Sequence, residues 1–235
     1  MVRMISRTKV GSLVKSFGQS ILSLSFNLGG MLAGTLLVLY LDVFSITSWA
    51  FLVFPGILSV RGAIGGLFSG RLSTALHVGT VRASYTNNTR YFYLLLSTII
   101  TLTLECSIMM GVTASLFGVF FLGITASDSF AILAVLITTM GLSLAFISPI
   151  TLGISVLAFK KGLDPDVIVY PVISTVADVL VTICYIVVLR GFFSVQWGRY
   201  LIGVFNLVFL LVVCYLVSRN YKEKEFLKKI GRAHV

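Results

Sequence analysis

One acidic residue, Asp178, stands within an apolar stretch that also carries regularly spaced hydroxyl groups. Ser174, Asp178 and Thr182 follow one another at intervals of four residues, and Thr175 precedes Asp178 by three. On a helix this spacing forms one oxygen-bearing stripe. Carboxylate and hydroxyl oxygens are hard donors that suit magnesium or calcium better than zinc or copper. The stripe therefore favours a wet pathway for a hard cation; the alternative is hydrogen bonding between helices.

Two further ionisable residues, Glu105 and Arg61, fall in other apolar stretches, where a charge is costly and marks function or pairing. Glu105 has three readings: it lines the same pathway, binds a proton, or neutralises Arg61. Arg61 precedes a glycine cluster that begins at Gly62 and ends at Gly70. Such a cluster permits close helix packing or a broken helix whose carbonyls face a cavity, and the adjacent arginine favours the broken helix.

The elements that must position these residues are long apolar stretches. Of the 235 residues, 57% are hydrophobic and 11% are charged, whereas a soluble domain carries about a quarter charged residues. A membrane-spanning helix needs roughly 20 apolar residues. Six stretches qualify, at 18–41, 48–70, 91–122, 129–159, 166–189 and 200–218. We therefore predict an all-α, polytopic transmembrane helical bundle whose third and fourth spans tilt or project beyond the bilayer.

Three prolines mark local features of the predicted spans. Asp164-Pro165 predicts a helix start, with the proline at the first helical position and the aspartate as its cap. Pro149 and Pro171 fall inside spans, where proline removes a backbone donor and crowds the preceding turn. We expect these two prolines to kink or unwind their helices.

The basic residues, which give the chain a formal charge of +10, are distributed unevenly. Fifteen of them flank the predicted spans on one side of the membrane, only Arg190 and Arg199 fall on the other, and Arg61 lies within a span. The positive-inside rule then places both termini in the cytoplasm of an inner or plasma membrane. The charge is a topology signal, supplemented by attraction to anionic lipids, and nucleic-acid binding is not expected.

No cofactor or catalytic site is expected from the remaining reactive side chains. Cys106, Cys184 and Cys214 fall within predicted spans and lack the spacing of a disulfide framework or a metal site. No histidine–carboxylate cluster or nucleophile motif appears, so the sequence does not predict an enzyme.

Two segments resemble the membrane domain of MgtE-type magnesium transporters. The first runs from Pro55 to Arg61-Gly62 and continues with Arg71-Leu-Ser-Thr-Ala; it is closest to the eukaryotic solute-carrier relatives of MgtE. The second runs from Gly162 through Asp164-Pro165 to Asp178 and is similar to the fifth span of the family. The resemblance covers roughly residues 15–190. The chain departs from the family at Ala63, where an asparagine is common.

The resemblance implies a divalent cation, usually magnesium, as transported substrate and a pore between two parallel five-helix units. It also implies that Asp178 binds the ion and that Ser174 and Thr175 line the pore beside it. Further candidates for pore or coupling residues are Glu105, Thr182, Arg61 and Gly62. Two alternatives remain open: a proton- or sodium-coupled carrier that uses Glu105, and a membrane assembly subunit that transports nothing.

The predicted organisation is a cytoplasmic segment (1–17), a five-span MgtE-like unit (18–190), a sixth span (191–218) and a basic cytoplasmic tail (219–235). Residues 230–235 read like a translated sequencing adapter. One acidic stripe is too little to surround a hydrated dication, so we expect two units. These are either a homodimer or the two halves of a longer tandem protein, since a sixth span returns the chain to the side where a second parallel unit could begin.

Overall fold

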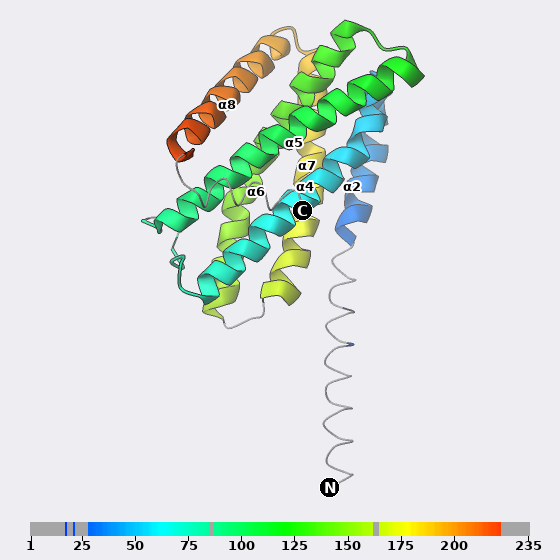
Figure 1. Cartoon of the computed structure of the whole chain (residues 1–235). Helices are drawn as coiled ribbons and strands as arrows, with labels where there is room; N and C mark the ends of the chain where they lie inside the picture. Colours follow the sequence, from blue (N-terminus) through cyan, green and yellow to red (C-terminus); the bar gives the residue numbers. More distant parts are fainter. Residues whose placement is uncertain (1–16, 18–20, 22–27, 85–86, 162–164, 222–235) are drawn as a thin grey trace.

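The structure, a computed structural model, describes residues 28–84, 87–161 and 165–221, together with Phe17 and Ile21 (Figure 1). These residues form helices joined by short connections, without a strand among them. The helices are α2 (Leu28–Leu39), α3 (Leu41–Phe44), α4 (Ser48–His77), α5 (Arg90–Leu122), α6 (Ala126–Lys160), α7 (Pro165–Ser194) and α8 (Gly198–Asn220). The predicted all-α bundle is confirmed.

Five of the helices, α4 to α8, are long and apolar enough to cross a membrane, α7 from Pro171 onward. They correspond to the second to sixth predicted spans. The first predicted span, 18–41, lies partly outside the described residues, and its described part contains α2, whose apolar segment Gly30–Leu39 is shorter than a span. The residues between the first two predicted spans, 42–47, are not entirely a loop, because the short helix α3 extends to Phe44.

Local sequence signals explain where several helices begin and end. The α6 helix starts with a capping box, in which the Thr125 backbone N–H donates to Asp128 Oδ2 (2.9 Å) and the Asp128 N–H donates to Thr125 Oγ1 (3.4 Å). The α5 helix ends at Gly123, whose φ of 62° is left-handed and suits a glycine. The α7 helix begins at Pro165, as predicted, while its proposed cap Asp164 lies outside the described residues.

The long helices run alternately up and down, so their ends gather at two opposite ends of the bundle (Figure 1). We call one the basic end, because Arg82, Arg90, Lys160 and Arg219 lie there, and the other the far end. The α5 helix has 33 residues, about 50 Å at 1.5 Å per residue, which exceeds a hydrocarbon core of about 30 Å. It lies beside α4 at a slant to α7 in Figure 1, consistent with the predicted tilt.

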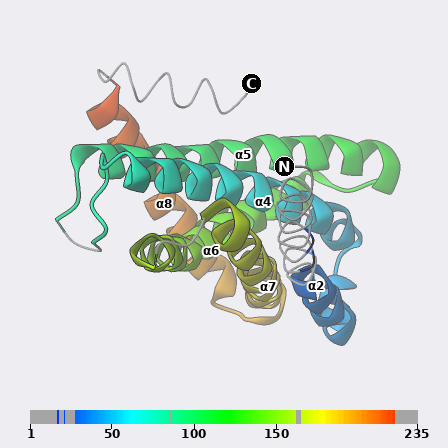
Figure 2. The same ribbon diagram turned by 90° about the horizontal axis from the view of Figure 1, so that it is seen from below.

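The α7 helix is central to the bundle, since it packs against α2, α4, α6 and α8 (Figures 1 and 2). An aromatic cluster joins it to α3 and α4. The ring centroids of Phe44 and Phe54 lie 5.2 Å apart, and those of Phe54 and Tyr185 lie 6.0 Å apart. The Tyr185 hydroxyl donates to the Ala50 carbonyl oxygen (2.9 Å), which satisfies a polar group in the core.

One local expectation was wrong: the α4 helix continues without a break through the glycine cluster, so no helix end opens beside Arg61. Of the two effects expected of Pro149 and Pro171, unwinding does not occur, because α6 and α7 continue through them, and a kink stays a prediction. A long helix in this bundle has neighbours on several sides, and packing supports the backbone across one missing donor. Nor do Gly62, Gly65 and Gly70 mark close packing among the described residues, because a Cβ at each would meet no side chain and no other helix within 4 Å.

Candidate functional site

Asp178 lies near the middle of α7 and is half-buried. Its helical neighbours Ala177 and Val181 face the core, while Ser174 and Thr175 are half-buried like Asp178 itself. Within the described residues the carboxylate makes no hydrogen bond and no ion pair. A carboxylate at this depth without a partner among the described residues is energetically costly, which marks Asp178 as a candidate site.

The hydroxyl groups of the stripe differ in what they can offer a ligand. Thr175 Oγ1 donates to the carbonyl oxygen of Pro171 (3.0 Å), and Thr182 Oγ1 donates to that of Asp178 (2.7 Å). Thr182 is fully buried, whereas Thr175 and Ser174 remain partly accessible. The accessible oxygens are therefore those of Ser174, Thr175 and Asp178, and Thr182 is enclosed in the core.

Arg61 is the buried cation of the bundle interior. It lies on the core face of α4 with 3% of its surface exposed. Its Nε and Nη1 atoms are buried and donate to no acceptor. The guanidinium group lies close enough to Cys184 on α7 for an electrostatic interaction. Pairing with Glu105, one of the three readings given for that residue, is therefore not seen at either of these nitrogens.

Glu105 is half-buried on α5, whose principal neighbours are α4, α6 and α8. The α7 helix is not among them, so the structure does not bring Glu105 and Asp178 together within one chain. Next to Glu105 along α5, Ile108 and Met109 are exposed on the outside of the chain. Gly62, the last predicted candidate, lies beside Arg61 with open space at its Cβ position.

Reasoning from the sequence missed three kinds of polar residue in the bundle. Tyr185 follows Asp178 by seven residues on the same face of α7. Nothing in the sequence indicated that its hydroxyl donates to α4, because a tyrosine in an apolar stretch is read as an apolar residue. Asn206 connects α8 to α6, since it accepts from Thr138 Oγ1 (2.8 Å) and donates to the Ala134 carbonyl oxygen (3.0 Å). On α6, three buried hydroxyls have no hydrogen-bond partner among the described residues, namely those of Thr139, Thr151 and Ser155.

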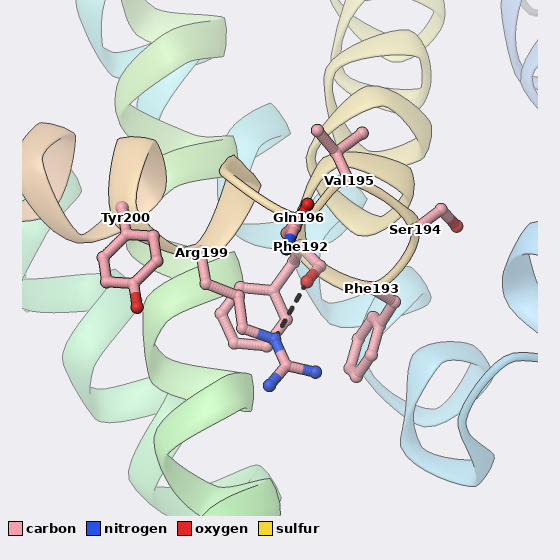
Figure 3. A pocket seen from close by; sticks show the side chains of 7 residues that line it. All are labelled: Phe192, Phe193, Ser194, Val195, Gln196, Arg199 and Tyr200. Atoms are coloured by element: carbon pink, nitrogen blue, oxygen red, sulfur yellow. Dashed lines mark hydrogen bonds between the residues drawn. The ribbon is translucent and has the colours of Figure 1, made fainter.

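A hollow of about 600 Å³ lies at the far end of the bundle, where α7 passes into α8 (Figure 3). Arg199 lies over the ring of Phe192, at 5.4 Å from its centroid, and its Nε donates to the Phe192 carbonyl oxygen (3.2 Å). Arg199 lines this hollow, and its positive charge would repel a cation. The hollow is also more than three turns of α7 away from Asp178.

No group of three or more His, Cys, Asp or Glu residues that could hold a metal ion occurs in the part of the chain that the structure describes. Within the described residues, the Asp178 carboxylate therefore stands without a cluster of further metal ligands.

Comparison with known proteins supports the resemblance seen in the sequence. The family model of the MgtE divalent cation transporters matches residues 54–188, more than half of the chain. No curated protein and no solved structure matches this chain. The matched residues contain Arg61, Glu105 and the whole α7 stripe, whereas the relationship to the eukaryotic branch stays a prediction. With five helices that are long and apolar enough to cross a membrane, and with this match, the chain is a multi-pass integral membrane protein that belongs to the MgtE family of divalent cation transporters.

Proposed function

We propose that this chain transports magnesium, without enzymatic activity or a bound cofactor, along the face of α7 that carries Asp178. The observation that carries the proposal is the half-buried Asp178 carboxylate on the central helix of the bundle, which has no partner among the described residues. A desolvated carboxylate attracts a dication strongly, since the low dielectric weakens the screening of both charges. Ser174 and Thr175 supply neighbouring oxygens on the same face.

The ion's own chemistry supports a pore formed by two units. Magnesium dehydrates reluctantly and usually keeps several of its waters, so it needs a wide passage with few carboxylates rather than a tight cage. One chain supplies one such carboxylate, and a second copy facing it would supply the other. The open positions beside Gly62, Gly65 and Gly70 leave room on α4 for a helix of another unit. We propose a homodimer, or a tandem protein of two such halves.

Magnesium flux into proteoliposomes, followed with an enclosed indicator, tests the role of Asp178. We expect Asp178→Asn to reduce the initial flux at least about tenfold, because the amide keeps the size of the side chain but loses its charge. Asp42→Asn is the matched control, since Asp42 is exposed on the short helix α3 and should leave the flux unchanged. Normal flux through Asp178→Asn would show that the carboxylate is structural and that the pathway lies elsewhere.

The same variant tests the two-unit pore when it is co-expressed with the wild-type chain. If a pore needs Asp178 from both copies, an equal mixture should retain about one quarter of the wild-type flux, because random pairing leaves that share of intact pairs. Independent subunits would retain about one half of the wild-type flux.

A proton gradient imposed across the proteoliposome membrane tests the alternative of a proton-coupled carrier. If the chain is such a carrier, the gradient should drive additional cation flux, and Glu105→Gln should abolish that additional flux.

A further inference from the structure

A cavity of about 710 Å³ lies at the basic end of the bundle, between the N-terminal end of α5 and the C-terminal end of α8. These two helix ends lie beside each other in Figures 1 and 2. The volume is in the range of sites that hold small molecules. The cavity is separate from the pathway proposed above, which follows α7, so its lining calls for a ligand of its own.

The part of the cavity nearest the membrane surface is basic. Arg90 is the first residue of α5 and Arg219 is the last but one of α8, and both line the cavity and are exposed. Asn220, a neutral donor, lines the same part. Among the described residues that line the cavity there is no aspartate or glutamate. Guanidinium groups bind phosphate with short, charge-assisted hydrogen bonds, so this part suits an anion of that kind.

Toward the centre of the bundle the lining becomes apolar. Leu94 and Ile100 of α5 line the cavity there, together with Leu216 of α8, which precedes Arg219 by about one turn. The rise along α5 from Arg90 to Ile100 is about 15 Å at 1.5 Å per residue, half of a hydrocarbon core of about 30 Å. A phospholipid has the same polarity, since its phosphate lies at the membrane surface and its acyl chains run inward.

Two other polar side chains of the lining are engaged in hydrogen bonds within the chain. The Asn88 amide donates to the carbonyl oxygens of Arg82 (3.0 Å) and Ser84 (2.9 Å). Ser97 Oγ donates to the carbonyl oxygen of Tyr93 (2.8 Å). These bonds hold the wall of the cavity in place, and the charge that an anion meets there comes from the two arginines.

We propose that this cavity binds one anionic phospholipid, with the phosphate between Arg90 and Arg219 and an acyl chain against Leu94 and Leu216. The basic end is the end that the positive-inside rule assigns to the cytoplasmic face, where anionic lipids give the membrane a negative surface potential. A soluble phosphate meets the same arginines but leaves the apolar lining uncovered. The bound lipid also fastens the end of α8, a helix with most of its surface exposed, to α5.

Native mass spectrometry of the full-length protein, with phosphatidylglycerol and phosphatidylcholine added in equal amounts, tests the site. We expect the wild-type chain to bind phosphatidylglycerol about tenfold more tightly than phosphatidylcholine, because basic side chains near the membrane surface attract an anionic headgroup. Arg90→Gln combined with Arg219→Gln should reduce this preference to less than about twofold. Arg219→Gln alone, at the exposed end of α8, should give an intermediate preference and keeps the test open if the double variant does not fold.

The matched control combines Lys160→Gln with Lys161→Gln, which removes the same charge from the same end of the bundle. Both lysines are exposed and neither lines the cavity. This control should keep the wild-type preference within about twofold, because exposed charges outside the cavity are screened by salt. An equal loss of preference in the two double variants would show that lipid binds to the basic end as a whole and would overturn the site. A wild-type chain without a preference would overturn it too.

Inorganic phosphate distinguishes a lipid headgroup from a soluble anion. At the same concentration it should not displace phosphatidylglycerol, because it cannot cover the apolar lining. Displacement would assign the cavity to a soluble phosphate and overturn the lipid. The melting temperature is a second measurement: phosphatidylglycerol should raise it for the wild-type chain and not for the arginine double variant, since a ligand stabilises the state that binds it. An equal rise for both would overturn the proposal.

Discussion

The hydroxyl of Thr182 shows how residues of one stripe take different roles. Its side chain is fully buried and donates to the carbonyl oxygen of Asp178, so it is directed to its own helix. Ser174 and Thr175 keep partial access at the other side of Asp178. At the residue scale, the accessible part of the stripe is therefore Asp178 and the part on its N-terminal side.

We expect Thr182→Val to transport magnesium at more than about half of the wild-type rate, because it removes a hydrogen bond worth only about 1 kcal/mol within the helix. Initial flux in proteoliposomes, normalised to the amount of inserted protein, is the measurement. A loss as large as that expected for Asp178→Asn would place the Thr182 hydroxyl in the ion pathway and contradict the burial seen here.

At the scale of elements, α8 is attached to the bundle by few contacts. Most of its surface is exposed, and its connection to α6 depends on Asn206, which bonds Thr138 and the Ala134 carbonyl. Gly141 of α6 allows the ring of Phe205 to approach, since a Cβ there would lie 3.1 Å from that ring. In lipid the hydrophobic effect does not drive two helices together, so hydrogen bonds between them, such as those of Asn206, contribute to holding α8 on α6.

We expect Asn206→Leu to destabilise the solubilised protein by about 1–2 kcal/mol, because both hydrogen bonds are lost and Thr138 is left unpaired. This amounts to a lower melting temperature by about 2–4 °C for each kcal/mol. Asn220→Leu, at the end of the same helix, is the control and should have the smaller effect. Equal melting temperatures for the two variants would show that α8 is held by packing alone.

At the scale of the whole molecule, the alternation of helix directions sorts the charges onto one end of the bundle. Arg82, Arg90, Lys160 and Arg219 share the basic end, while Arg190 and Arg199 lie near the far end. A bilayer with anionic lipid on its cytoplasmic face retains such an end on that side. The orientation, and the cytoplasmic placement of both termini, stay predictions.

Single cysteines test this orientation in intact cells. Ser45, Ser127 and Ser194 are exposed at the far end, and Asn87 is exposed at the basic end. We expect an impermeant thiol reagent to label cysteines placed at the three serines from outside, and to label Asn87→Cys only after the membrane is opened. Labelling of Asn87→Cys in intact cells would reverse the assignment.

The sequence alone determined the spans, the start of α7 and the family. Five predicted spans were confirmed, and α7 begins at the predicted Pro165. These features are local: a run of apolar residues must be helical in lipid, and a proline fits the first turn of a helix wherever that helix packs. The α7 stripe was likewise readable, because spacing along one helix fixes which side chains share a face.

Only the tertiary structure decided what each face meets. It separated Glu105 from Asp178, buried Thr182 and Arg61, and kept α4 continuous through its glycines. Helical periodicity specifies the direction of a side chain relative to its own axis, but not which helix stands beside it. That choice depends on the simultaneous packing of α2, α4, α6 and α8 around α7, a property of the whole bundle that no single segment carries.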